Sequence, residues 1–250
     1  SGGLAVGLDR VLDTKFTLGA ATSYSLSHVK EKINPSSLTL IKSYQAMLYG
    51  TYNFTKTRYL NWVINMAANN YQSTHYININ GVSFIPKAKY SSQQFSTKGI
   101  WGKDYAMSDF SQITPMASLQ YTYAKQYTYS ETDGGGANQT IVRENSNTVQ
   151  VGLGGKLSVP LNLDPAIFSP EIHAMFLYNV INGKQNSVSS FVDGGGQMLA
   201  RMNLARAGLK VGCGFTMATI DRLELKLNVD REFRDRYTNS SFYFNFKYTL

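Results

Sequence analysis

The sequence predicts an all-β protein, an antiparallel up-and-down β-barrel that spans a membrane. The first observation is that apolar and polar residues alternate in segments spread along the whole chain. The second is that the connections between these segments are alternately short and long. The third is composition: charged residues make up 16% of the 250 residues, below the roughly 25% typical of soluble domains, and aromatic residues make up 13%. A wall that is apolar outside and polar inside has such a composition.

The alternating segments are predicted to be strands, because successive side chains of a strand point to opposite faces. Leu223, Leu225 and Leu227 share one face, whereas Glu224 and Lys226 share the other. About eleven such strands of roughly ten residues are long enough to cross a bilayer when tilted. Similar alternation occurs in residues 4–8, 16–22, 44–54, 60–68, 149–159, 209–217 and 242–250, and more loosely in residues 92–107.

The connections separate a membrane barrel from a soluble sandwich. A transmembrane barrel has short turns at its periplasmic rim and longer loops outside, whereas a Greek-key sandwich has no reason to alternate them. Successive strands cross the membrane in alternate directions, so counting from the short turns predicts that the carboxyl terminus lies at the periplasmic rim. Residues 197–206 fit either a short amphipathic helix or a strand extension above the membrane. The short connections are residues 11–14, 55–58, 108–112, 163–166 and 220–222, and the long polar ones are 28–42, 75–89, 130–146 and 182–196.

The strand count also bears on domain organisation. The even spread of strands favours one domain over residues 1–250. Single-chain bacterial barrels close with an even number of strands, so a count of eleven predicts at least one strand upstream of Ser1. No signal peptide begins the chain, and no apolar run approaches the roughly 20 residues of a transmembrane helix. We therefore expect an amino-terminally truncated barrel domain.

Polar residues of the alternating segments are expected to line the lumen. About twelve strands should leave a narrow polar pore that admits a helix or an extended chain. The lining groups either hold such a polypeptide or merely satisfy one another in a wet lumen. Inward glycines such as Gly212 and Gly214 would either relieve crowding and widen the bore or bend the strands. The lumen-lining candidates are Asn61, Asn65, Asn69, Gln120, Glu171, His173, Lys210, Glu224, Lys226 and Asp230.

The residue patterns speak against catalysis and cofactors. The net charge of +8 comes from scattered Lys and Arg residues, without the clustering typical of nucleic-acid binding. No His, Cys and carboxylate spacing matches a metal site, and no glycine-rich loop joins a strand to a helix. The three histidines lack the partners that a hydrolase needs. The single cysteine, Cys213, is predicted to pack on the apolar face.

The chain resembles the translocator β-domain of bacterial autotransporters, the classical type V secretion family. The resemblance extends nearly from end to end. Each matching stretch is short and degenerate, so the order and spacing of the stretches are the specific part. They are residues 2–9, 16–25, 43–54, 113–115, 168–172 and 246–250.

The resemblance implies a twelve-stranded barrel, anchored in outer-membrane lipid, that exports its own upstream passenger to the cell surface. It also implies a first strand and a pore-spanning linker helix before Ser1, a monomeric barrel inserted by the barrel-assembly machinery, and no cofactor. Some barrels of the family cleave their own linker with an acidic lumen residue, for which Glu171, Glu224 and Asp230 are candidates by position. The carboxyl-terminal assembly signal would be Phe242, Phe244, Phe246, Tyr248 and Leu250, with Leu250 standing where the family usually has Phe.

Two other functions stay open at this point. One is a stand-alone outer-membrane porin or an adhesin that binds through its long loops, and the other is an outer-membrane hydrolase. A passenger encoded upstream of Ser1 would favour the translocator. A signal peptide only one strand upstream would favour the stand-alone barrel.

Overall fold

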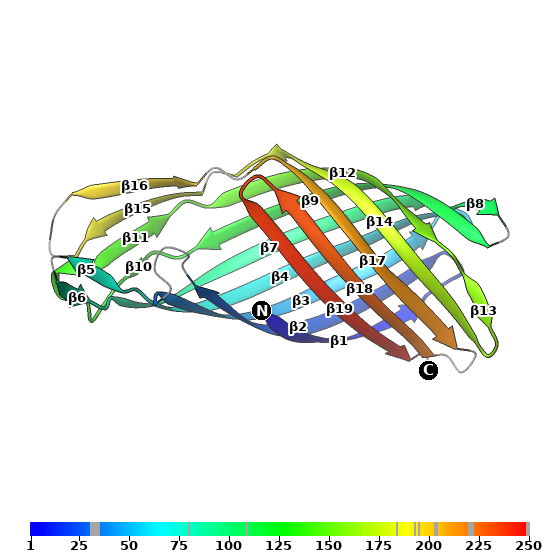
Figure 1. The fold of residues 1–250 in the computed structure, drawn as a ribbon, viewed down its shortest axis with the longest axis horizontal. Coiled ribbons are helices and arrows are strands. Elements are labelled where there is room, and N and C mark those ends of the chain that lie inside the picture. Colours follow the sequence, from blue (N-terminus) through cyan, green and yellow to red (C-terminus); the bar gives the residue numbers. More distant parts are fainter. Residues whose placement is uncertain are drawn as a thin grey trace.

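The computed structural model shows one long antiparallel sheet curled into an elongated wall (Figure 1). It describes residues 1–30, 36–79, 81–108, 110–183, 185–192, 194, 196–202, 205–219 and 223–248. Eleven strands follow one another around this wall in chain order, which confirms the predicted all-β, up-and-down fold. They are β1 (Gly2–Val11), β2 (Phe16–Lys30), β3 (Leu38–Asn53), β4 (Arg58–Thr74), β7 (Lys87–Lys103), β9 (Ser111–Gln126), β12 (Ser146–Ser158), β14 (Ala166–Ile181), β17 (Ala207–Thr219), β18 (Leu223–Arg234) and β19 (Tyr237–Tyr248).

Two further short strands lengthen the sheet at the rim of the short turns. β8 (Tyr105–Ser108) pairs with β9, and β13 (Leu161–Leu163) pairs with β14. At this rim the Asp13 carboxylate caps a tight turn by accepting hydrogen bonds from the backbone N–H groups of Lys15 and Phe16. Asp and Asn favour such turns because their side chains bond the backbone two or three residues ahead.

The opposite rim differs from the sequence expectation. Three of the four long stretches predicted to be loops contain strands. β5 (Ile77–Ile79) and β6 (Val82–Phe84) form a hairpin. A separate four-stranded sheet has the order β10-β11-β15-β16, from β10 (Tyr129–Ser130), β11 (Gln139–Arg143), β15 (Gln185–Phe191) and β16 (Gln197–Met202), and we call it the extension sheet. A 3-10 turn, η1 (Gly135–Ala137), precedes β11.

Two details complete this rim. The sequence of residues 197–206 fitted either a helix or a strand, and in the structure this region begins with strand β16. The connection between β18 and β19 is a tight turn at Asp235 and Arg236, with Arg236 in the left-handed region at φ 59°. The connections at this rim therefore include a tight turn as well as long segments.

The main sheet has an apolar convex face and a polar concave face. Large apolar side chains on the convex face remain open, as Leu4 (83% exposed) and Leu153 (67% exposed) show. On the other face, Lys98 of β7 interacts electrostatically with Lys210 of β17 and Asp230 of β18, four and five places further along the sheet. Side chains so far apart along the sheet approach one another only if their face is concave.

The curl also brings the two ends of the sheet together. Lys247 Nζ of β19 donates to Asp9 Oδ2 of β1 at 2.6 Å, on the concave side. Buried apolar side chains are few, with Met175 (8% exposed) and Leu177 (4%) among them, so pairing between strands holds the wall together more than a central apolar core does. Among the residues that the structure describes, no helix has the length and apolar character to cross a membrane.

Candidate functional site: the polar concave face

The structure places the ten lumen-lining candidates on the concave face, as strand register shows. Asn61, for example, pairs with Ile100 of β7, which pairs with Ser118 of β9. Paired residues point to the same side of a sheet, so such rows can be followed around the wall. By strand, the candidates are Asn61, Asn65 and Asn69 on β4, Gln120 on β9, Glu171 and His173 on β14, Lys210 on β17, and Glu224, Lys226 and Asp230 on β18.

Three of these candidates meet in one charged cluster. Asp230 Oδ1 lies 2.8 Å from His173 Nε2, and Asp230 Oδ2 lies 2.7 Å from Lys210 Nζ. Asp230 is only 8% exposed, so its carboxylate depends on these two partners. A charge-assisted hydrogen bond is shorter and stronger than a neutral one, and this carboxylate makes contacts on both oxygens.

Gly212 makes the contact between His173 and Asp230 sterically possible. In the register it lies between them, because His173 pairs with Gly212 and Gly212 pairs with Asp230. A Cβ at Gly212 would overlap both the Asp230 carboxylate and the His173 ring. The missing side chain therefore lets two strands interact across a third. Sequence reasoning assigned this glycine to bore width or strand bending, but here it makes room for its neighbours.

A second cluster forms around Glu171. Its carboxylate oxygens lie 3.7 Å from Lys156 Nζ of β12 and 3.6 Å from Lys226 Nζ of β18. The Glu171 side chain is 9% exposed, whereas the lysines are more open. Each buried carboxylate thus lies between two basic side chains. We call these six residues the charged wall: Lys156, Glu171, His173, Lys210, Lys226 and Asp230.

The concave face of β3, β4, β7 and β9 is largely uncharged, with Lys98 of β7 as an exception. Asn69 Nδ2 donates to Ser92 Oγ at 3.1 Å, and Gln150 Nε2 donates to Asn179 Oδ1 at 2.8 Å. Thr51 Oγ1 donates to Asn61 Oδ1 at 2.8 Å. We call the amide and hydroxyl side chains on this face of β3, β4, β7, β9 and β12 the neutral wall.

The remaining candidates fit these walls less tightly. Gln120 Nε2 donates to Thr122 Oγ1 of the same strand at 3.3 Å. Glu224 pairs in register with Lys247, but the Lys247 ammonium binds Asp9 instead. The Asp9–Lys247 contact was missed by sequence reasoning, because no local signal connects residues 238 positions apart.

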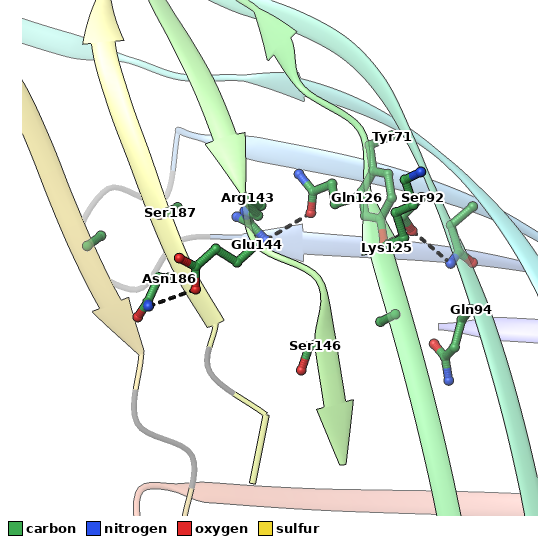
Figure 2. Close-up of a pocket in the computed structure, with 13 residues that line it drawn as sticks. Tyr71, Ser92, Gln94, Lys125, Gln126, Arg143, Glu144, Ser146, Asn186 and Ser187 are labelled. Carbon is green, nitrogen blue, oxygen red and sulfur yellow. Dashed lines mark hydrogen bonds between the residues drawn. The ribbon is translucent and has the colours of Figure 1, made fainter.

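A pocket at the rim of the extension sheet was also missed. A cavity of about 360 Å³ lies between the upper neutral wall and the extension sheet, and we call it the mouth pocket. Figure 2 shows Arg143 and Glu144 lying between Gln126 of β9 and Asn186 of β15. Arg143 Nη1 donates to Gln126 Oε1 at 3.0 Å, and Asn186 Nδ2 donates to Glu144 Oε2 at 2.9 Å. The first of these bonds links the barrel wall to the extension sheet, and the second joins β15 to the residue that follows β11.

Three stacked tyrosines join the extension sheet to the wall beside this pocket. The ring centroids of Tyr71 and Tyr90 are 4.6 Å apart, and those of Tyr90 and Tyr129 are 3.9 Å apart. Burial raises the pKa of the Tyr129 hydroxyl well above its ordinary value, so this phenol stays neutral.

The proposed assembly-signal residues lie on the convex face of β19. Phe242 (65% exposed) and Tyr248 (59% exposed) mark the two ends of this apolar stripe, with Phe244 and Phe246 between them. Leu250 lies outside the described residues. Cys213 is on the same convex face of the sheet and is exposed. In the part of the chain that the structure describes, no group of three His, Cys, Asp or Glu side chains is arranged to hold a metal.

Comparison with known proteins gives consistent matches over nearly the whole chain. Residues 1–230 match the family model described as autotransporter beta-domain. The chain is 24% identical to outer membrane protein B of Rickettsia typhi over 245 residues, covering 94% of this chain and 15% of that protein. It is 25% identical to outer membrane protein A of Rickettsia rickettsii over 251 residues, covering 94% and 11%. The chain therefore spans only a small part of these relatives.

Two solved structures share the fold. The translocator domain of the autotransporter NalP from Neisseria meningitidis has a TM-score of 0.78 at 15% identity, with 98% of this chain and 79% of that one covered. The beta domain of the Bordetella autotransporter BrkA has a TM-score of 0.72 at 16% identity, with 99% and 90% covered.

Proposed function

The chain belongs to the autotransporter β-domain family, and from this premise we propose that it exports its own upstream passenger domain through its lumen to the bacterial cell surface. The observation that carries the proposal is the contrast between the two faces of the sheet. An exposed apolar convex face suits lipid, and a concave face of amides, hydroxyls and paired charges suits a hydrated path for a polypeptide.

The pairing of charges on the charged wall supports a transport role. A lone buried charge would attract an oppositely charged segment and hold it, whereas Glu171 and Asp230 each already lie between two basic groups. A polypeptide of any sequence then meets a wall without a strong charge of one sign. The same groups would position a linker helix through hydrogen bonds at their remaining donor and acceptor sites.

We place the carboxyl terminus at the periplasmic rim and the extension sheet outside the cell. Short turns lie at the rim where β19 ends, and the extension sheet lies at the other rim. The apolar stripe of β19 is the segment that we expect the barrel-assembly machinery to recognise, because a long apolar edge strand is suited to strand addition. We further propose that the barrel is a monomer in outer-membrane lipid.

An upstream strand would complete the wall at the seam between β1 and β19. In the part of the chain that the structure describes, these two strands are not paired with each other, and each has one neighbour in the sheet. The Asp9–Lys247 bond crosses the seam through side chains only, so the backbone groups of both edges remain available. A strand placed there would satisfy both edges, and the linker helix would precede this strand in the chain and lie in the lumen.

The direct test is to read the gene upstream of Ser1 and to express the full-length protein with a tag in the upstream region. Protease added to intact cells should remove the tag if the passenger is outside. A matched strain with Leu225→Arg, which blocks insertion into lipid, should keep the tag protected. A short upstream region with only a signal peptide and one strand would contradict the proposal and would make the chain a stand-alone barrel.

A further inference from the structure

The mouth pocket is a built site apart from the charged wall, and we propose that it binds an extended stretch of the exported polypeptide through the peptide groups of that stretch. The inference rests on the proposed function and adds to it the ligand class and the residues. The pocket lies on the concave side, where β4, β7 and β9 meet the extension sheet (Figure 2).

The lining of the pocket resembles a peptide backbone chemically. Asn69, Gln94, Gln126 and Asn186 come from four different strands and all line the cavity. Each carries an amide, which offers N–H donors and a carbonyl acceptor in one plane. A polypeptide that passes in extended form offers the same donors and acceptors at regular intervals, so it can pair with these groups whatever its side chains are.

One amide in the pocket has a donor without a partner. Gln126 Oε1 accepts a hydrogen bond from Arg143, but Gln126 Nε2 is buried and has no partner among the described residues. A buried donor left unpaired destabilises a protein, because it has lost its hydrogen bonds with water and gained none in return. Further along the same face, Asn65 Oδ1 is a buried acceptor in the same condition. A peptide carbonyl and a peptide N–H are the groups that would satisfy these two atoms.

The pocket lining carries charges of both signs, from Lys125, Arg143 and Glu144, which does not favour a small ion of either sign as the ligand. Arg143 is engaged with Gln126, and Glu144 is engaged with Asn186. Beside these groups the lining contains Lys125, whose ammonium lies over the Tyr127 ring, together with alanines, serines and the Tyr71 ring. The volume, about 360 Å³, is within the range of ligand sites, roughly 300–1,000 Å³.

The pocket also continues the neutral wall. Asn65 and Asn69 lie on the same face of β4, so a chain that follows the neutral amides from the lumen reaches the pocket as it leaves. The extension sheet supplies the second side of the pocket, which the barrel wall alone lacks. In this role the extension sheet holds the emerging chain extended at the exit.

Site-specific photo-cross-linking in the full-length precursor tests this inference. Gln94 lines the pocket, and its neighbour Gln93 points to the opposite face of β7, so benzoylphenylalanine at each position gives a matched pair. We expect several-fold more adduct with the upstream polypeptide from Gln94 than from Gln93. Ser187 and Val188 of β15 provide a second pair, in case substitution at Gln94 prevents folding.

Surface protease treatment of the unsubstituted protein separates the two proposals. If the upstream tag is exposed but both cross-linking pairs give equal or no polypeptide adduct, the pocket inference is wrong and the export function stands. An adduct with saccharide or lipid in place of polypeptide also overturns it. If the tag never reaches the surface although the barrel is inserted, the proposed function fails, and this inference fails with it.

Discussion

On β12, β14, β17 and β18 six charged side chains of the concave face form two three-member clusters, whereas on β3, β4, β7 and β9 the amides and hydroxyls of this face bond largely in pairs. The charged wall depends on contacts across an intervening strand, as between His173 and Asp230 over Gly212. The neutral wall depends mainly on neighbours in register, as between Asn69 and Ser92. From this difference we expect single substitutions to lower the stability of the barrel more in the charged wall than in the neutral wall.

The largest effect should come from exchanging the character of the two faces on β18. Leu225→Arg places a charge on the convex face and should weaken insertion into lipid by roughly 2–4 kcal/mol near the middle of the membrane. Lys226→Gln, one residue further on the concave face, should weaken insertion much less, because Glu171 keeps Lys156 as a charged partner. Urea titration of the folded fraction in lipid vesicles measures the insertion free energy of both variants. Equal losses would mean that the faces, and with them both walls, are wrongly assigned.

Gly212→Ala should be the next most harmful change. Its Cβ would overlap the His173 ring and the Asp230 carboxylate, and overpacking typically costs about 1–3 kcal/mol. Gly155→Ala on β12 is the control, because its Cβ would meet only the Thr114 carbonyl oxygen at 3.5 Å. Urea midpoints of the full-length protein in vesicles compare the two. Similar midpoints would show that the contact across β17 contributes nothing.

A double-mutant cycle should measure the coupling within the charged wall. Asp230→Asn, Lys210→Met and the double variant should give a coupling of about 1–2 kcal/mol, since the pair is partly buried and charge-assisted. The coupling should fall as salt is raised, because Lys210 is partly open to solvent. A coupling near zero at low salt would remove the distinction between the walls.

The smallest effect should come from the same cycle on the neutral wall. Asn69→Ala, Ser92→Ala and the double variant should show a coupling of about 0.5 kcal/mol, because a single neutral hydrogen bond has a small net contribution. Added salt should leave this coupling energy unchanged, because both partners are neutral. A coupling as large as that of the charged wall would contradict the expectation that the neutral wall is less sensitive to substitution.

The sequence predicts the eleven strands and their faces because each long strand separates lipid from a polar interior, which forces a period of two. The extension sheet lacks this constraint. Strand β15, for example, reads Gln-Asn-Ser-Val-Ser-Ser-Phe, with no regular alternation, and β10 has only two residues. Short polar strands of this kind cannot be distinguished from loops by pattern alone.

Contacts on the concave face were predictable only in part. Periodicity places His173, Lys210 and Asp230 on one face, but their meeting depends on the register among three strands. Register is set by pairing and turn geometry along the whole wall, which residue types do not specify. The same holds for the mouth pocket, where residues from the barrel and from the extension sheet converge.

The bond between Asp9 and Lys247 bears on the order in which the molecule is built. Its partners belong to the first and last strands of the sheet and are 238 positions apart. Contacts between residues so distant in sequence close a very large loop, and they form late unless the intervening strands are already paired. Cysteines placed at these two positions, with Cys213 replaced, would therefore report the last step of assembly. A bifunctional maleimide with a spacer long enough to span one intervening strand should join them only after the first and last strands have come together.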